Sequence, residues 1–196
     1  MTIENRIRIF RAALLDTQLS DEIIVQRHII HPPPYVFDGD NDKYFSLKSI
    51  ISAFFQVNPE EVKMVGSAKL GFSIAPFQLW KPFDDSSDID MVIVSSKVFE
   101  DFWMDLYEFN INLTVRTQEE QEMYSRFIDY FFKGWIRPDL FPFKYPQKRQ
   151  WFTFFKSISY GEFGPRKVTG AIYKDMEFFE KYHTLNIRRL RSGRII

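Results

Sequence analysis

The sequence contains no cysteine. Disulfide bonds, thiolate metal sites and a cysteine nucleophile are therefore excluded, and a reducing compartment is compatible with the composition. Long apolar runs are also missing: no stretch approaches the about 20 apolar residues that cross a bilayer, and charges interrupt residues 1–16 too often for a secretion signal. These absences lead us to expect a soluble, cytoplasmic protein with no membrane partner.

An excess of one charge is lacking as well. The 26 basic and 26 acidic residues cancel to a formal net charge of zero, so general attraction to nucleic acid is not indicated and only local patches could supply it. Aromatic residues, by contrast, are abundant: they make up 18% of the chain and include 22 phenylalanines. Most of these rings must lie in a core, because a monomer does not expose so much apolar surface without a partner.

Helical and strand patterns alternate along the 196 residues. Apolar spacing predicts helices over 3–15, 46–56, 97–109 and 175–190 and strands over 62–65, 88–94 and 168–173. The capping box that joins Thr117 and Glu120 predicts a further helix that reaches about Trp135. Prolines predict a rigid connector over 32–34 and a long loop over 138–150.

This order predicts an α/β or α+β fold, with a small mixed sheet flanked by helices and helical additions at both ends. We expect residues 1–58 to form an N-terminal helical segment that packs on a domain of residues 59–196, in one compact unit.

Asp88 and Asp90 stand at the start of an apolar run that ends at Val94. Residues two apart in a strand point to the same face, so the two carboxylates repel each other unless a cation lies between them. Mg²⁺ suits such a pair, because it takes one or two carboxylates together with phosphate oxygens and water. The alternative is a solvated strand entrance after the polar turn 84–87.

Gly66 and Ser67 follow the predicted strand 62–65. A glycine there lets the backbone turn sharply and lets a phosphate approach closely, and the serine hydroxyl adds a donor. Lys69 is near enough in sequence to add positive charge. The alternatives are a plain turn and an ordinary surface lysine.

Taken in order, these residues resemble the polymerase-beta-like nucleotidyltransferase superfamily. Its hallmark is an apolar strand that ends in Gly-Ser or Gly-Gly, a variable gap, and Asp-x-Asp within a second apolar strand. The matching stretches here are MVGSAKLGFS and SSDIDMVIV. The resemblance covers about residues 62–96, and the strand and helix near the C-terminus add weak support.

The resemblance implies that Asp88 and Asp90, with a third carboxylate, bind Mg²⁺ or Mn²⁺, and that Gly66, Ser67 and Lys69 hold the phosphates of a nucleoside triphosphate. The product would be a nucleoside monophosphate on an acceptor hydroxyl of a nucleic acid, protein, nucleotide or small molecule. The short chain suggests a bacterial defence or toxin-type member rather than a processive polymerase.

Two features depart from the family pattern. The gap between Ser67 and Asp88 is long, so it could hold a substrate loop or a lid. The predicted strand 168–173 contains no third acid. Asp175 follows that strand but is expected to cap a helix, and Asp139 and Glu162 fall in predicted loops. An inactive module that binds nucleotide, nucleic acid or a protein is therefore the alternative function.

Three further features have more than one interpretation. The first is the basic stretch near the C-terminus, which could be a solvated helix face or a contact for phosphates. A nucleic-acid-binding protein that uses it is a third hypothesis. The second is the pair of rings at Trp80 and Phe83, which are either core or able to stack on a base. The third is His183, which we expect to be packed and hydrogen-bonded rather than catalytic. The members of the basic stretch are Arg166, Lys167, Lys174, Lys181, Arg188, Arg189, Arg191 and Arg194.

Overall fold

The centre of the molecule is a mixed sheet. The computed structural model describes residues 1–112, 115–141 and 145–193, and its strands are β1 (Val62–Val65), β2 (Ile89–Val94), β3 (Trp135–Ile136) and β4 (Val168–Tyr173). Their order in the sheet is β1-β2-β4-β3. β2 runs antiparallel to β1 and parallel to β4, and β3 pairs antiparallel with the end of β4. The expected α+β class and mixed sheet are confirmed.

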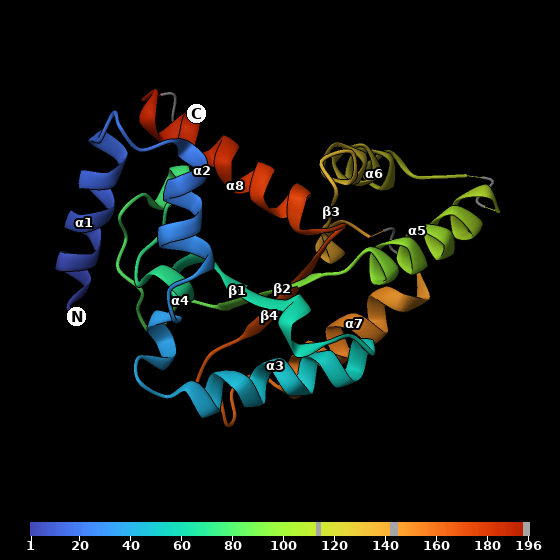
Figure 1. The fold of residues 1–196 in the computed structure, drawn as a ribbon. Coiled ribbons are helices and arrows are strands. Elements are labelled where there is room, and N and C mark those ends of the chain that lie inside the picture. The colour runs from blue at the N-terminus through green and yellow to red at the C-terminus, as the bar shows by residue number, and fades with distance from the viewer. Residues whose placement is uncertain (113–114, 142–144, 194–196) are drawn as a thin grey trace.

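One face of the sheet carries the main hydrophobic core. Ile89, Met91 and Ile93 alternate along β2 and point into it. The helices that supply its other large side chains are α3 (Asn41–Phe55), α5 (Ser96–Ile111), α6 (Gln118–Phe131) and α7 (Pro146–Ser157). Figure 1 shows α3 and α7 below the sheet, with α5 and α6 at its far end.

The opposite face packs against α8 (Met176–Arg191). Val92 and Val94 of β2 meet Phe179 of this helix. The helix begins where Asp175 Oδ1 accepts a hydrogen bond from the Phe178 N–H at 3.0 Å, as expected for an N-cap. Figure 1 shows α8 crossing above the sheet toward the N-terminal helices.

The N-terminal elements pack on the second half of α8. They are α1 (Ile3–Leu15), α2 (Asp21–Ile24) and the π-helical turn η1 (Val25–Ile30). Phe10 and Ile24 join Ile187 of α8, together with Leu70 and Phe72, in a second hydrophobic cluster. The cluster also reaches the short helix α4 (Gly66–Leu70), which follows β1. The first 58 residues share their cores with the rest of the chain, because α3 contributes Leu47 and Ile51 to the main core.

Four helical segments differ from the sequence pattern. α3 begins at Asn41 rather than at residue 46. α6 ends at Phe131 rather than near Trp135, because a turn through Gly134 at φ +65° leads into β3. α7 begins inside the predicted loop 138–150 and covers its last five residues; Pro146 is its first residue, where the missing N–H costs no helical hydrogen bond. Residues 21–30 are helical, although only a short apolar stretch marks them. In the described part of the chain, no helix has the length and apolar character needed to cross a membrane.

Candidate functional site

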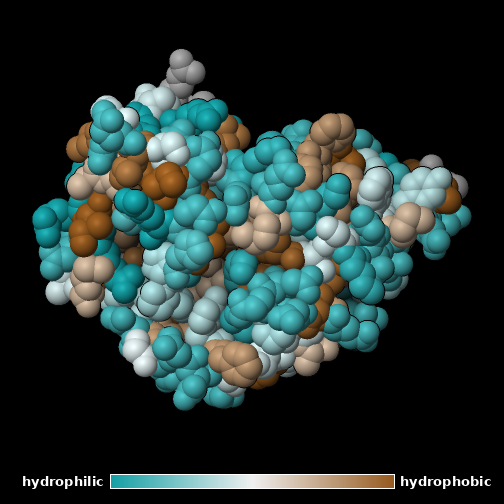
Figure 2. Space-filling model, viewed as in Figure 1, coloured by the Kyte–Doolittle hydropathy of each residue, from teal (hydrophilic) through white to brown (hydrophobic). Residues whose placement is uncertain are grey.

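A cavity of about 1170 Å³ opens over the sheet and around the outer side of β4. Its walls come from the end of β1 and the start of α4, the middle of β2, all but one residue of β4, and the facing parts of α7 and α8. Figure 2 shows the molecule from the side of Figure 1, with hydrophilic residues over most of this face and hydrophobic atoms between them where the surface is hollowed.

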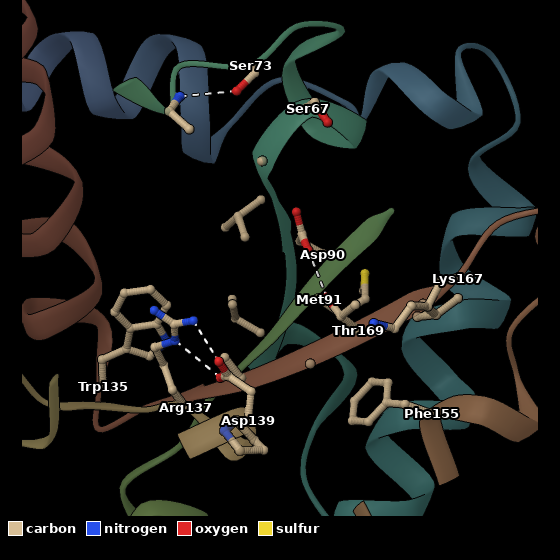
Figure 3. Close-up of a pocket in the computed structure, with 18 of the residues that line it drawn as sticks. Ser67, Ser73, Asp90, Met91, Trp135, Arg137, Asp139, Phe155, Lys167 and Thr169 are labelled. Atoms are coloured by element: carbon tan, nitrogen blue, oxygen red, sulfur yellow. Dashed lines mark hydrogen bonds and ion pairs between the residues drawn. The ribbon is translucent and has the colours of Figure 1, made fainter. Parts of the chain in front are cut away.

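Asp90 lies at the point where three strands meet. Its neighbour on β1 is Val65 and its neighbour on β4 is Thr169. Gly66 follows Val65 at φ +67°, and a Cβ at this position would lie only 2.5 Å from Asp90 Oδ2. Glycine is therefore required for the chain to turn directly against the carboxylate. Ser67 lines the same cavity, and Figure 3 shows it above Asp90.

The surroundings of Asp90 shift its acidity. Burial raises the pKa of this carboxyl, and the negative charge of Asp88 raises it further. The Thr169 hydroxyl, which donates to Asp90 Oδ1 at 2.7 Å, and the ammonium of Lys167 act in the opposite direction. The net pKa shift is upward, so the ionised form of Asp90 is less stable here than in water. Such a carboxylate gains from a cation.

Asp88 occupies the margin of this site. It directly precedes β2, is partly buried, and does not line the cavity, although its charge acts on Asp90. The turn in front of it is structured: Asp84 Oδ1 accepts hydrogen bonds from the N–H and hydroxyl of Ser86, and Arg166 pairs with Asp85 at 2.9 Å. The structure thus brings Gly66, Ser67 and Asp90 to one cavity and leaves Asp88 beside it.

Lys69 points away from the cavity. Its ammonium donates to the carbonyl of Ile30 at 3.2 Å and to the carbonyl of Pro32, and the residue is buried. Burial, followed by the charges of Lys63 and Lys48, lowers the pKa of Lys69 to about 8. The predicted phosphate ligand therefore anchors the proline connector to α4, and the structure does not bring it to the other candidate residues.

Thr169 takes the position on β4 next to Asp90 where the resemblance implies a third carboxylate. Asp139 does line the cavity, but both its oxygens are paired with the guanidinium of Arg137, at 2.7 and 3.2 Å. Asp175 caps α8, and the Glu162 carboxylate lies 3.5 Å from the Ser46 hydroxyl. Across residues 1–112, 115–141 and 145–193, no three His, Asp or Glu side chains gather closely enough to hold a metal ion.

These donors fit one magnesium ion but not two. Asp90 Oδ2 is free of the Thr169 hydrogen bond, and Asp88 is near enough to contribute charge. Mg²⁺ commonly keeps several waters and takes only one or two carboxylates when phosphate oxygens complete its shell. A second ion would need a further acid next to Asp90, and the described residues do not supply one.

Positive charge is in excess around the cavity. Four basic side chains and two carboxylates line it, which leaves a net charge of +2. The basic residues are Arg137, Lys156, Lys167 and Arg189, and the acids are Asp90 and Asp139. Of the basic stretch near the C-terminus, Lys167 and Arg189 reach the cavity, whereas Arg166, Lys181, Arg188 and Arg191 pair with acids elsewhere. Arg194 lies outside the described residues.

The rings that line the cavity are not those singled out in the sequence. Trp80 packs edge-on against Phe10 in the second cluster, and Phe83 is buried beneath Arg166. Trp135, Phe155 and Tyr160 line the cavity instead, and no sequence signal marks them. Lys156 is missed together with Phe155: both belong to the second half of α7, a stretch for which the sequence predicts no element.

His183 is packed as expected but has no hydrogen bond. It is 8% exposed, and Phe179 lies against its ring at 4.6 Å between centroids. Neither ring nitrogen has a partner among the described residues. Burial lowers the pKa of His183 to about 4, so the imidazole is neutral at pH 7.

No protein-family model matches the chain, and no curated protein or solved structure does. The function therefore has to be inferred from the geometry of the cavity and from the resemblance of residues 62–96.

Proposed function

We propose that this protein is a metal-dependent nucleotidyltransferase, which transfers a nucleoside monophosphate from a nucleoside triphosphate to an acceptor hydroxyl. One observation carries the proposal: the turn at Gly66, which follows β1, lies against the Asp90 carboxylate, and both residues line the cavity. Residues 24 positions apart, which the family motif requires together, thus meet at one point. A plain surface turn would not need a glycine against a partly buried acid.

The excess of cations supports an anionic ligand. Lys167 and Arg189 line the cavity with Ser67, and neither forms an ion pair within 4 Å of a described acid, although the charge of Lys167 acts on Asp90. A triphosphate is attracted by the net positive charge of the lining, and the Ser67 hydroxyl can donate to a phosphate oxygen. Asp90 and Asp88 would hold the magnesium ion, which when bound neutralises phosphate charge and acidifies an acceptor hydroxyl.

Asp90 has its own positioning residue. The hydrogen bond from Thr169 fixes one carboxylate oxygen, so the other is directed at the turn made by Gly66. The cost of keeping this acid ionised away from water is offset when a cation binds. The arrangement therefore prepares Asp90 to bind a cation–phosphate complex.

A second candidate function is a module that binds nucleotide without transferring it. Thr169 favours this alternative, because a neutral hydroxyl occupies the place of the third carboxylate next to Asp90. With one ion instead of two, the attacking oxygen has less assistance. Nucleotide binding itself would then be the function, for example by stabilising a complex with a protein partner.

Transfer and binding assays separate the two functions. Labelled nucleoside triphosphates with Mg²⁺ or Mn²⁺ and candidate hydroxyl acceptors test transfer, and calorimetry tests binding. Because loss of a residue that merely supports a metal ligand costs about 10–100-fold, Asp90→Asn should reduce metal-nucleotide affinity by at least that factor. Asp101→Asn, on the exposed surface of α5, is the matched control and should change nothing.

The outcomes are distinct. Transfer that is lost in Asp90→Asn and kept in Asp101→Asn supports the enzyme. Binding that depends on Asp90 without turnover supports the module. If neither triphosphate binding nor transfer depends on Asp90, both functions are wrong.

A further inference from the structure

The outer edge of β4 is open inside the cavity. β3 pairs only with Ile172 and Tyr173, so residues 168–171 have no neighbouring strand on the side away from β2 in the described part of the chain. All four of these residues line the cavity. Unpaired backbone groups at such an edge are strong hydrogen-bonding groups that need a partner.

Alternation along β4 decides which groups are unpaired. The carbonyls of Lys167 and Tyr173 accept hydrogen bonds from the β2 side, at 2.9 and 3.1 Å. On the other side, the Val168 N–H donates to Ser159 Oγ at 2.9 Å and the Lys174 N–H donates to the carbonyl of Gly134 at 2.9 Å. Even-numbered residues therefore face the open edge.

Gly170 is the residue left without a partner. Ser159 already bonds Val168, and Ile136 of β3 pairs with Ile172. The N–H and C=O of Gly170 point in the same direction between them, and no group in residues 1–112, 115–141 or 145–193 pairs with them on that side. In an antiparallel pair, one residue's N–H and C=O form a closely spaced donor and acceptor.

One aromatic ring packs against Gly170, and a second lines the same cavity. The ring of Phe155 lies so close to Gly170 that no side chain fits there, and both residues line the cavity. Figure 3 shows Phe155 beside β4. Tyr160 also lines the cavity and is 69% exposed, and its backbone is left-handed at φ +57°, a conformation that non-glycine residues seldom adopt. The Tyr160 N–H donates to the Arg166 carbonyl at 2.8 Å, which ties the turn to the chain before β4.

We propose that Gly170 recognises a nucleobase: its N–H and C=O pair with an acceptor and an adjacent N–H donor on the edge of the base, and Tyr160 stacks on the ring. Each nucleobase carries a donor beside an acceptor, and proteins read such edges with stacking from aromatic side chains. An extended peptide fits less well, because strand addition uses several residues and only one is free here. The ligand class rests on the proposed function, since it is taken from the phosphate and metal residues at Asp90.

The base could belong to the donor triphosphate or to a nucleotide acceptor. Asp90 on β2 is the direct neighbour of Thr169 on β4, and the open edge is the outer side of β4. Neighbouring strands are about 4.8 Å apart. A nucleotide whose phosphates lie at Asp90 and Ser67 would extend across β4 toward Gly170.

Nuclear magnetic resonance can observe Gly170 directly. Thr169-Gly170 is the only Thr-Gly pair in the sequence, so ¹⁵N-glycine with ¹³C-carbonyl threonine selects a single amide signal. Adenosine, guanosine, cytidine and uridine are titrated without metal. At least one should shift this signal, and the shift should persist in Asp90→Asn, because a nucleoside has no phosphate. If none of the four moves the Gly170 signal, the site does not exist, whether or not triphosphate binds at Asp90.

A pair of tyrosine variants tests the stacking. Tyr160→Asn removes the ring but keeps a residue that tolerates the left-handed conformation, and it should weaken nucleoside binding about tenfold. Tyr107→Asn removes an exposed ring from α5 and should have no effect. Equal affinity of the two variants would overturn the assignment of Tyr160.

A competition experiment identifies the source of the base. If a non-hydrolysable magnesium nucleoside triphosphate displaces the nucleoside, the donor's base occupies the Gly170 site. If both bind together, the acceptor's base does. Either result supports the site and identifies its occupant.

Discussion

At the scale of single residues, Gly66 shows how tightly backbone and carboxylate are fitted. Gly66→Ala should cost about 1–2 kcal/mol for its left-handed conformation alone. The new Cβ would also displace Asp90 Oδ2, so metal-nucleotide binding should weaken as well. Thermal unfolding and calorimetry measure the two effects.

Gly39→Ala is the matched control for this change. Gly39 also has a positive φ, +87°, but a Cβ added there would have no atom within 4 Å. Gly39→Ala should therefore lose stability because alanine is strained at a positive φ, but it should bind nucleotide as the unchanged protein does. Equal binding by the two variants would mean that the Gly66 turn does not contribute to the ligand site.

His183 should make the protein sensitive to acid. Its pKa is lowered from 6.5 to about 4 in the folded state, so between these values the unfolded chain binds a proton that the native state excludes. The contribution of the neutral His183 to the free energy of unfolding is fully present above pH 6.5. It is lost as the pH falls toward 4, which lowers the free energy of unfolding by on the order of 3 kcal/mol. His183→Phe should remove this part of the pH dependence without the loss of any hydrogen bond, as urea unfolding at several pH values would reveal.

His31→Gln serves as the comparison, because His31 is exposed. This variant controls for the replacement of a histidine at a position where no packed ring is removed. If the His183→Phe profile is unchanged between pH 6.5 and 4, the histidine does not remain neutral in the fold.

At the scale of elements, Arg191 joins the end of α8 to the N-terminal helices. Its guanidinium donates to the carbonyls of Leu14 at 3.0 Å, Leu19 at 2.8 Å and Asp16, and it pairs with Asp21 at 2.9 Å. Arg191→Met would leave these acceptors without their donor, at a cost of about 1–3 kcal/mol.

Hydrogen exchange should locate this loss in α1 and α2. Arg188→Met is the control, since Arg188 is 64% exposed and also contacts Asp21; an exposed pair contributes about 0–1 kcal/mol. Comparable effects of the two substitutions would show that the carbonyl contacts of Arg191 contribute little.

At the scale of the whole molecule, the shared cores predict one cooperative unit. Phe10→Ala removes a ring that is 2% exposed and packs with Phe72, so it should cost about 3–5 kcal/mol and lower a single melting transition. Circular dichroism and tryptophan fluorescence should report the same midpoint. Phe77→Ala, at a side chain that is 95% exposed, should change stability by less than about 0.5 kcal/mol. Two separate transitions in Phe10→Ala would instead indicate an N-terminal unit that unfolds alone.

The sequence by itself determined the central strands and the meeting of the Gly66 turn with Asp90. The strands at 62–65 and 168–173 were predicted at their observed bounds, and the one at 88–94 differs by a single residue. Gly66 and Asp90 were also identified correctly as neighbours in space. The strands follow from apolar runs of strand length. The meeting of Gly66 with Asp90 was expected from the resemblance of residues 62–96 to the nucleotidyltransferase motif.

Only the tertiary structure decided the rest of the site. In the fold, Lys69 points toward Ile30 and Pro32, Thr169 lies beside Asp90, α7 begins inside a predicted loop, and Gly170 is unpaired at the open edge. None of these is encoded by neighbouring residues. Lys69 donates to carbonyls that lie more than 30 positions away in the sequence. The outer edge of β4 is open because β3 is only two residues long. Such choices depend on which segments meet when the core closes, because burial and pairing are properties of the assembled chain.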